Sequence, residues 1–343
     1  MKFTKTAWIA TMATVALGAT ACGGDGGEGS DGAEPVTLRV GHVFPASSPI
    51  HVAATAWADQ VKEETDGRVE ISVFPGSQLG SDVEMGEGLQ SGTVECGMVN
   101  YAAAGIDPRL QLSFMPYIVT GYDGADALFY GDGFVANHDR ELLAERGVEV
   151  LAFYENDFRG LSNSKHAVHT PADLEGLKLR VPETPMYVDM FKAWGAQPLA
   201  MAFSELYTAL QQGTVDGQDN GLALTTDSQF GEVQSYMTLT NHAYGTGALA
   251  CNEDTWAQVG DDQDTVRAAA ETMSVDMRQA LRDARPDRME TLKAQGVEVV
   301  ELTDAEMAEF VKIKEVIWPQ FEEVFGTDVI AGLREASEAV AGG

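Results

Sequence analysis

The sequence is poor in cysteine and in basic residues, and both shortages exclude classes of function. Its 343 residues include 3 cysteines, which form no CxxC pair and no Cys/His cluster of the kind that holds zinc. Lysine and arginine number 22 against 53 aspartates and glutamates, a formal net charge of −31. Nucleic acid is therefore excluded as an expected partner, because its binding requires cations that neutralise phosphates. If the ligand is an anion, its site must supply strong local positive charge.

Sequence motifs of familiar enzyme classes are also absent. The chain has no GxGxxG after its first expected strand, no GxxxxGK[ST], no GxSxG and no HExxH. His166 and His169 are three residues apart, but Pro171 and the polar neighbours favour a surface loop over a metal site. We therefore predict a protein that is not an enzyme and has no metal and no cofactor. An exported α/β enzyme is the remote alternative, because no nucleophile–base pair emerges from the strand ends.

The apolar run from Ala7 to Ala19 is too short for a comfortable membrane span and follows a short basic region, as in a secretory signal. Small residues lead from it into Cys22, the position that is acylated in bacterial lipoproteins, although Ala19 stands where leucine is usual. We expect 1–21 to be a lipoprotein signal peptide and Cys22 to carry the lipid. An ordinary signal peptide with an incidental cysteine is the alternative.

The next segment, 22–35, reads CGGDGGEGSDGAEP and has no apolar anchor larger than alanine, so we expect a flexible acidic tether. The mature protein would then lie outside the cytoplasm, in the periplasm or at the outer face of the cytoplasmic membrane. The lipid at Cys22 would be its sole contact with the membrane. Cys96 and Cys251 lie in apolar, strand-like segments. A disulfide is permitted in an exported protein, and two buried free thiols are equally consistent with the sequence.

From Val36 onward the chain alternates predicted strands and helices in two series. The first series has strands at 37–44, 68–74, 93–100 and 148–154, with helices at 49–67 and 81–92 and a further helix before the last strand. The second has strands at 177–182, 196–201 and 214–217, with helices at 185–195 and 203–213. Then follow a strand at 247–252, a long charged helix from about Asp254 to Gln295, a strand at 297–302 and two helices, the first opened by the capping box Thr303 and Glu306.

This alternation predicts an α/β fold with two lobes, because repeated strand–helix units build parallel sheets covered by helices. We assign 36–155 plus about 246–285 to the first lobe, and about 156–245 plus about 286–340 to the second. Ligands of open α/β sheets bind beyond the C-terminal ends of the strands, so we expect a cleft where these ends face each other.

Arg180 stands at the end of the expected strand LKLRVP, on the face opposite Leu179 and Val181. A guanidinium group matches a carboxylate in two parallel hydrogen bonds, which suits a cleft residue for an anionic ligand. An ion pair with one of the 53 acids is the alternative, and on this evidence alone it is the commoner explanation. Arg159, in NDFRGLSN, offers a second positive group with the same alternative.

The segment LKLRVPETPMYVDMFKAWGAQPLAMAFSELYTALQQGTVDGQDN resembles the signature region of the solute-binding proteins of tripartite ATP-independent periplasmic (TRAP) transporters. The stretches HVFPASSPIH, GSQLGSDVEMGEGLQSGTVE and LTNHAY extend the resemblance over essentially the whole mature chain. It implies a periplasmic-binding-protein-like fold, class II-like, with crossing strands and a long helix that spans both lobes. The implied function is to capture a small carboxylate in the cleft, close over it, and deliver it to a separate membrane permease.

The same resemblance implies site residues. The selectivity arginine of the family falls on Arg180, a second ligand-contacting arginine on Arg159, its cleft asparagine on Asn220 and its cleft phenylalanine on Phe203. Glu84 matches a first-lobe polar position that contacts ligand or orients an arginine in some members. Asp216, Gln218 and Asp219 are expected to fix the turn around Asn220. Where the family continues DGQENP, this chain has DGQDNGL, so Gly221 replaces a proline and leaves the direction of the Asn220 side chain open.

For the first-lobe wall the strand ends suggest three further contacts, Phe44, Asn100 and Tyr101, although packing explains the two aromatic residues equally well. The sequence does not identify the solute. It also leaves open a receptor of the same fold that presents its ligand to a sensor kinase instead of a permease.

Overall fold

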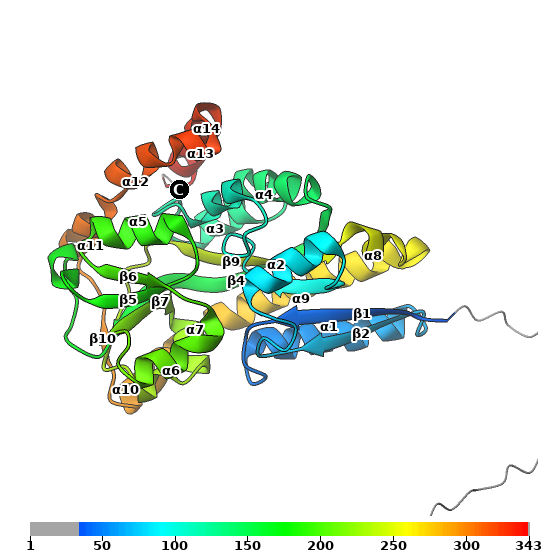
Figure 1. The fold of residues 1–343 in the computed structure, drawn as a ribbon, viewed down its shortest axis with the longest axis horizontal. Helices are drawn as coiled ribbons and strands as arrows, with labels where there is room; N and C mark the ends of the chain where they lie inside the picture. Colours follow the sequence, from blue (N-terminus) through cyan, green and yellow to red (C-terminus); the bar gives the residue numbers. More distant parts are fainter. Residues whose placement is uncertain (1–33, 342–343) are drawn as a thin grey trace, which may run out of the picture. The chain divides into compact units, whose positions relative to one another are not determined.

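The structure is a computed structural model that describes residues 34–341 (Figure 1). The predicted signal peptide, Cys22 and nearly all of the predicted tether lie outside these residues. Within 34–341, no helix is both long enough and apolar enough to cross a membrane.

The first series of strands and helices builds one part of a mixed sheet, in the strand order β2-β1-β3-β9-β4. Strand β1 runs parallel to β2 and β3, whereas β9 runs antiparallel to β3 and β4. The strands are β1 (Val36–His42), β2 (Val69–Phe74), β3 (Cys96–Val99), β4 (Val148–Asn163) and β9 (Tyr244–Asn252). The helices are α1 (Pro49–Glu64), α2 (Asp82–Ser91), α3 (Tyr122–Phe129) and α4 (Phe134–Ala144).

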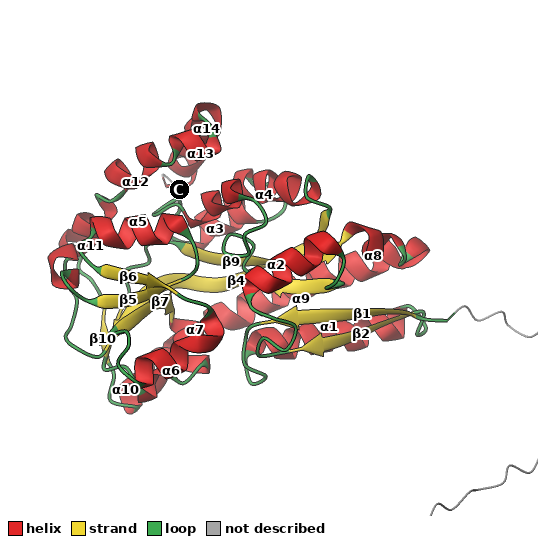
Figure 2. Ribbon diagram, in the orientation of Figure 1, coloured by secondary structure: helices red, strands yellow, loops and turns green. Residues whose placement is uncertain are grey.

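The second series continues the sheet beyond β4 in the order β4-β7-β5-β6, with β8 beside β4 and β10 beside β8. These strands are β5 (Lys178–Val181), β6 (Gln197–Ala200), β7 (Gly217–Gly221), β8 (Tyr236–Thr238) and β10 (Glu298–Val300). The helices are α5 (Pro185–Ala193), α6 (Leu206–Gln211) and α7 (Leu222–Asp227). Helices lie on both sides of the strands (Figure 2), which is the layering that the alternation predicts.

Strand β4 connects the two parts of the sheet. Its first section pairs with β9, and from Arg159 onward it pairs with β7 and β8. The change occurs at a register shift between Glu155 and Phe158, where Asp157 has a φ of 58°, in the left-handed region that non-glycine residues seldom adopt. We expected this strand to end at Tyr154. It continues to Asn163 because the polar residues beyond Tyr154 are buried between partners on both sides.

The long helix expected from about Asp254 to Gln295 is three helices, α8 (Glu253–Ala257), α9 (Gln263–Asp283) and α10 (Arg285–Ala294). Gly260, with a φ of 62°, separates α8 from α9. Pro286 lies in the first turn of α10, where its missing N–H costs no hydrogen bond. Helix α9 packs against α1 and β4, whereas α10 packs against α7 and β10, so the run still passes from the first part of the fold to the second.

The C-terminal helices contact both series, and the division into lobes that we expected for 286–340 stays a prediction. They are α11 (Asp304–Val311), α12 (Lys314–Gln320), α13 (Glu322–Phe325) and α14 (Thr327–Ala341). Helix α12 packs against α5, but α14 packs against α3 and α4, and Trp318 Nε1 donates to the Pro116 carbonyl at 3.0 Å. The capping box at Thr303 and Glu306 is confirmed.

Cys96 and Cys251 form a disulfide, which decides between the two alternatives that the sequence left open. The two residues are direct partners across β3 and β9, and both are fully buried. The bond therefore fixes the return of the chain from the second series into the first.

Candidate functional site

The ends of strands from both series surround a cavity of about 40 Å³, which has room for a few water-sized groups. The parallel strands β1 and β3 end beside it at Phe44 and Asn100, and β5, which runs parallel to β6 and β7, ends there at Arg180 and Pro182. This is the position that the general rule for α/β sheets gives to a ligand. Six of the eight residues that the sequence suggested as ligand contacts line this cavity: Phe44, Asn100, Arg159, Arg180, Phe203 and Asn220.

Arg180, on β5, is a buried arginine whose hydrogen bonding is incomplete. Strand β5 lies between β6 and β7, and 4% of Arg180 is exposed. Its Nε donates to the Met201 carbonyl at 2.9 Å, and Cζ lies 5.9 Å from the centre of the Phe203 ring. Within residues 34–341, its two terminal nitrogens have no acceptor and no carboxylate within 4.0 Å. Burial, and then the charge of Arg159, lowers the pKa of Arg180 to about 10.

Arg159, on β4, is by contrast already paired. Its Nε lies 3.0 Å from Asp219 Oδ1, and its Nη2 donates to Asp219 Oδ2 at 3.0 Å and to the Asp219 carbonyl at 2.7 Å. Cζ lies 5.1 Å from the Tyr187 ring centre. Burial opposes the charge, but the adjacent Asp219 outweighs it and raises the pKa of Arg159. Arg159 thus reaches the cavity with its charge largely neutralised.

Asp219 has a structural role, as the sequence suggested for the residues beside Asn220. Burial opposes its ionisation, but Arg159 and His242 outweigh burial and lower the pKa of Asp219 to about 2. His242 Nε2 lies 3.1 Å from the same carboxylate, although the ring is not aligned for a hydrogen bond. Gln218 donates to Ser162 Oγ at 2.9 Å and joins β7 to β4.

Strand β7 lies later in the chain than we expected. The prediction placed a short strand at 214–217 with a polar turn after it, whereas residues Gly217–Gly221 are themselves the strand. Asn220 therefore points from a strand and not from a loop. Its Oδ1 accepts from Arg159 Nη2 at 3.2 Å, and its Nδ2 donates to Gln218 Oε1 at 2.6 Å.

Gly221 does not use the backbone freedom that the loss of proline provides. Its φ is −69°, within the range of a proline. Instead it provides space, because a Cβ at this position would lie 2.8 Å from the Phe158 carbonyl oxygen in the irregular section of β4. The close approach of β4 and β7 explains the glycine.

Two of the eight suggested residues lie outside the cavity. Glu84 is exposed at the third position of α2, where its Oε2 accepts from the Ser81 N–H at 2.8 Å and completes a capping box. Tyr101 is a core residue, 2% exposed, with its ring 5.8 Å from that of Phe153. The Glu84 side chain is thus engaged in the capping box, and the Tyr101 ring is packed in the apolar core.

Asp82 takes the place in the cavity wall that we expected for Glu84. Its Oδ1 accepts from the Asn100 N–H at 2.9 Å, and Oδ2 has no donor within the described part of the chain. Burial raises the pKa of Asp82 to about 6, against the opposing effect of that hydrogen bond and of the Arg180 charge. A sequence signal existed, because a capping box of Ser81 and Glu84 leaves Asp82 as the free acid of this turn.

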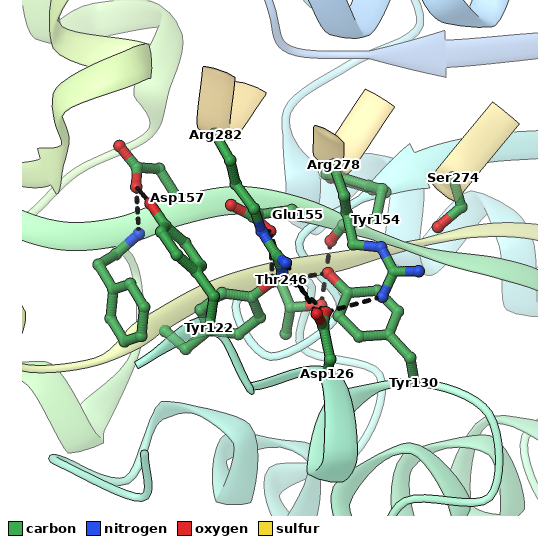
Figure 3. Close-up of polar contacts among 12 residues, drawn as sticks. Tyr122, Asp126, Tyr130, Tyr154, Glu155, Asp157, Thr246, Ser274, Arg278 and Arg282 are labelled. Atoms are coloured by element: carbon green, nitrogen blue, oxygen red, sulfur yellow. Dashed lines mark hydrogen bonds and ion pairs between the residues drawn. The ribbon is translucent and has the colours of Figure 1, made fainter. Parts of the chain in front are cut away.

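Two acids of β4, Glu155 and Asp157, belong to a group of ion pairs that we call the crossing-strand cluster (Figure 3). Its other members are Asp126, Arg278, Arg282 and Arg285. Arg282, from α9, donates to Glu155 Oε2 at 2.8 Å and to both oxygens of Asp126, on α3, at 2.7 and 2.8 Å. Arg285 donates to Asp157 at 2.8 Å, and Asp157 also accepts from the N–H of Ala223 at 3.3 Å. The remaining member is Arg278, which lies 3.1 Å from Asp126. The cluster connects both series of the fold at the irregular section of β4.

The geometry of the cavity suits an anion rather than a metal ion. The second series contributes donors, the terminal nitrogens of Arg180 foremost, and the first contributes the acceptors of Asp82 and Asn100. No group of three or more potential metal ligands occurs within residues 34–341.

Comparisons with known proteins agree with this geometry. The family described as bacterial extracellular solute-binding protein, family 7, matches residues 40–324. A solute-binding protein of Roseobacter denitrificans is 33% identical over 301 residues, which are 85% of this chain and 92% of that protein.

Solved structures show the same two-lobed fold. The sugar acid binding protein of Advenella mimigardefordensis, in complex with galactonate, has a TM-score of 0.84 and 29% identity, and the match covers 90% of this chain and 99% of that one. A TRAP periplasmic solute-binding protein of Sulfurospirillum deleyianum with bound succinate has a TM-score of 0.81 and 30% identity, covering 88% and 99%. The expected α/β class and two-lobed fold are confirmed, and this chain belongs to the family 7 extracellular solute-binding proteins, the binding proteins of TRAP transporters.

Proposed function

We propose that this solute-binding protein captures a small organic carboxylate between its lobes, outside the cytoplasm, and delivers it to the membrane permease of a TRAP transporter. The protein is not an enzyme in this proposal, and the lipid on Cys22 holds it at the membrane. One observation carries the choice of ligand class, which is the buried guanidinium of Arg180, whose two terminal nitrogens have no acceptor among residues 34–341.

An unpaired buried charge is costly, so a site that keeps one is suited to a ligand of opposite charge. A carboxylate accepts two parallel hydrogen bonds from a guanidinium group, which would complete the bonding of Arg180. Phe44 and Phe203 supply apolar walls that exclude water and strengthen this pairing. The ligands in two related structures, galactonate and succinate, are both carboxylates.

The size of the cavity supports capture by lobe closure. About 40 Å³ does not admit an organic acid of four or more carbons without movement of the surrounding side chains or lobes. Binding would then shift the population toward a closed form that the permease recognises, by as much as the ligand prefers that form.

A thermal-shift screen of the purified protein against a carboxylate library tests this function, because a ligand that binds the folded state raises the melting temperature by mass action. Calorimetry on the best ligand should then show that Arg180→Lys weakens binding about 10- to 1000-fold, since lysine leaves a buried carboxylate half-paired. Arg68→Lys is the matched control, because Arg68 is exposed and pairs with Asp262 outside the cavity. A library without a single ligand, or unchanged affinity in Arg180→Lys, would show that the proposal is wrong.

A further inference from the structure

The two sides of the cavity differ in what they offer a ligand. On the side of the second series, the two terminal nitrogens of Arg180 are donors without an acceptor among residues 34–341. On the side of the first series, the unpaired atoms are acceptors. Asp82 Oδ2 has no donor, and the Asn100 side-chain oxygen is buried with no hydrogen-bond partner in the described part of the chain.

Asp82 and Arg180 do not satisfy each other. They are close enough to influence one another's ionisation, yet no ion pair within 4.0 Å joins them among the described residues. Space for a ligand therefore lies between a group that requires an anion and a group that requires a hydrogen-bond donor. A molecule that satisfies both carries a carboxylate at one end and hydroxyl groups farther along.

The charges at the cavity also restrict the ligand. Arg159 is neutralised by Asp219, so Arg180 is the cavity-lining cation without a partner within residues 34–341. Asp82 and Glu183 both line the cavity and both bear on the ionisation of Arg180. One ligand carboxylate matches the free cation. A second would face two carboxylates with no cation left to pair with.

We infer that the ligand is a hydroxylated monocarboxylate, such as a sugar acid, and that Asp82 determines this specificity by accepting a ligand hydroxyl and by repelling a second carboxylate. This inference rests on the proposed function and narrows it. Asp82 is suited to the role because the Asn100 N–H fixes its Oδ1, while its Oδ2 has no hydrogen-bond donor among residues 34–341. Asp82→Asn keeps an oxygen for the Asn100 bond and removes the charge, so it separates specificity from folding.

Length-matched acids test the inference by calorimetry on the full mature chain. D-Erythronate is compared with succinate, and D-galactonate with galactarate, in which a second carboxylate replaces the terminal hydroxymethyl group and the other hydroxyls are kept. The wild type should bind at least one of the two monocarboxylates about 100-fold or more tightly than the dicarboxylate of the same length. Asp82→Asn should weaken that monocarboxylate about 10- to 100-fold, the range for loss of a hydrogen bond to a charged group, and should not weaken the dicarboxylate.

Glu84→Gln is the matched control, because it neutralises a carboxylate two residues away that lies outside the cavity, and glutamine still completes a capping box. Its preference between the paired acids should stay within about twofold of wild type.

The inference is wrong if the wild type binds a dicarboxylate as tightly as its matched monocarboxylate, if neither monocarboxylate binds, or if Asp82→Asn leaves the preference unchanged. In each of these cases the proposed function stands as long as some carboxylate binds in a manner that depends on Arg180. Failure of every carboxylate, or binding that is insensitive to Arg180→Lys, defeats the proposed function itself.

Discussion

Arg180 and Arg282 are both largely buried arginines, and of the two only Arg282 is paired with carboxylates among the described residues. Arg282 donates to Glu155 and to both oxygens of Asp126, and its Cζ lies 4.4 Å from the Tyr122 ring centre. Burial opposes its charge, but these carboxylates outweigh burial and raise its pKa, whereas burial lowers the pKa of Arg180 to about 10. Figure 3 shows Arg282 between Glu155 and Asp126 in the crossing-strand cluster.

This difference distinguishes an arginine that stabilises the fold, Arg282, from one that is available to a ligand, Arg180. When a buried arginine is paired with carboxylates, its removal leaves those carboxylates buried without a counter-charge. The loss therefore destabilises the folded protein. A buried arginine that lacks a partner costs stability in the free protein, and this cost is recovered only when a ligand supplies the partner. The following variants test this distinction.

The largest expected effect is in the crossing-strand cluster. Arg282→Met should lower the free energy of unfolding by about 3–5 kcal/mol, because it leaves Glu155, 1% exposed, without its cation. Urea unfolding of the ligand-free protein measures this. Arg68→Met removes an arginine whose side chain is 58% exposed and should cost less than about 1 kcal/mol. Equal losses in the two variants would contradict the role assigned to the cluster.

A smaller effect of opposite sign is expected at Asp82. Its pKa is about 6 in the folded protein against 3.8 unfolded, so folding favours the protonated carboxyl and the wild type loses stability as pH rises from about 4 to 6. The Asp82→Asn variant does not lose stability in this way, because asparagine does not ionise. It should match the wild type near pH 4 and be more stable by about 1–3 kcal/mol at pH 8. Denaturant titrations of both proteins at the two pH values give the comparison, and a gap that is the same at both would exclude Asp82 as its source.

The smallest expected effect is on the stability of a variant that no longer binds. Arg180→Met should unfold within about 1 kcal/mol of the wild type or be more stable by up to about 2 kcal/mol, because folding disfavours the arginine charge at every pH below about 10. Carboxylate binding should be lost in the same variant. A loss of stability comparable with that of Arg282→Met would show that Arg180 has a structural partner.

The sequence predicted the order of strands and helices and the position of Arg180 because both follow from local patterns. The periodicity of apolar residues identifies β1, α1, β2 and β5. An arginine two residues before a strand-ending proline can be placed at the C-terminal end of its strand. The prediction failed for β7 and for the second half of β4, since buried strands are expected to be apolar. Those strands are polar and are stabilised by distant partners such as Arg159 and Asp219, which are 60 residues apart.

The first-lobe side of the site was predicted less well, for a similar reason. Glu84 and Tyr101 are polar or aromatic residues close in sequence to the cavity-lining Asp82 and Asn100. The Glu84 side chain is engaged in the capping box, however, and Tyr101 is buried in the core. Which acid on a helical turn remains free depends on the cap, and that could have been read from Ser81 and Glu84. The packing of Tyr101 against Phe153, 52 residues further along the chain, had no local signal.

The disulfide of Cys96 and Cys251 closes a covalent ring that includes Asn100, Arg159, Arg180 and Asn220 and leaves out Phe44 and Asp82. A chain exported from its N-terminus presents Cys96 well before Cys251, because 155 positions separate them. The bond can therefore form only after the strands of the second series that lie between the two cysteines, β5 to β8, have been exported. Protein made in a reducing compartment lacks the covalent link between β3 and β9 that closes this ring.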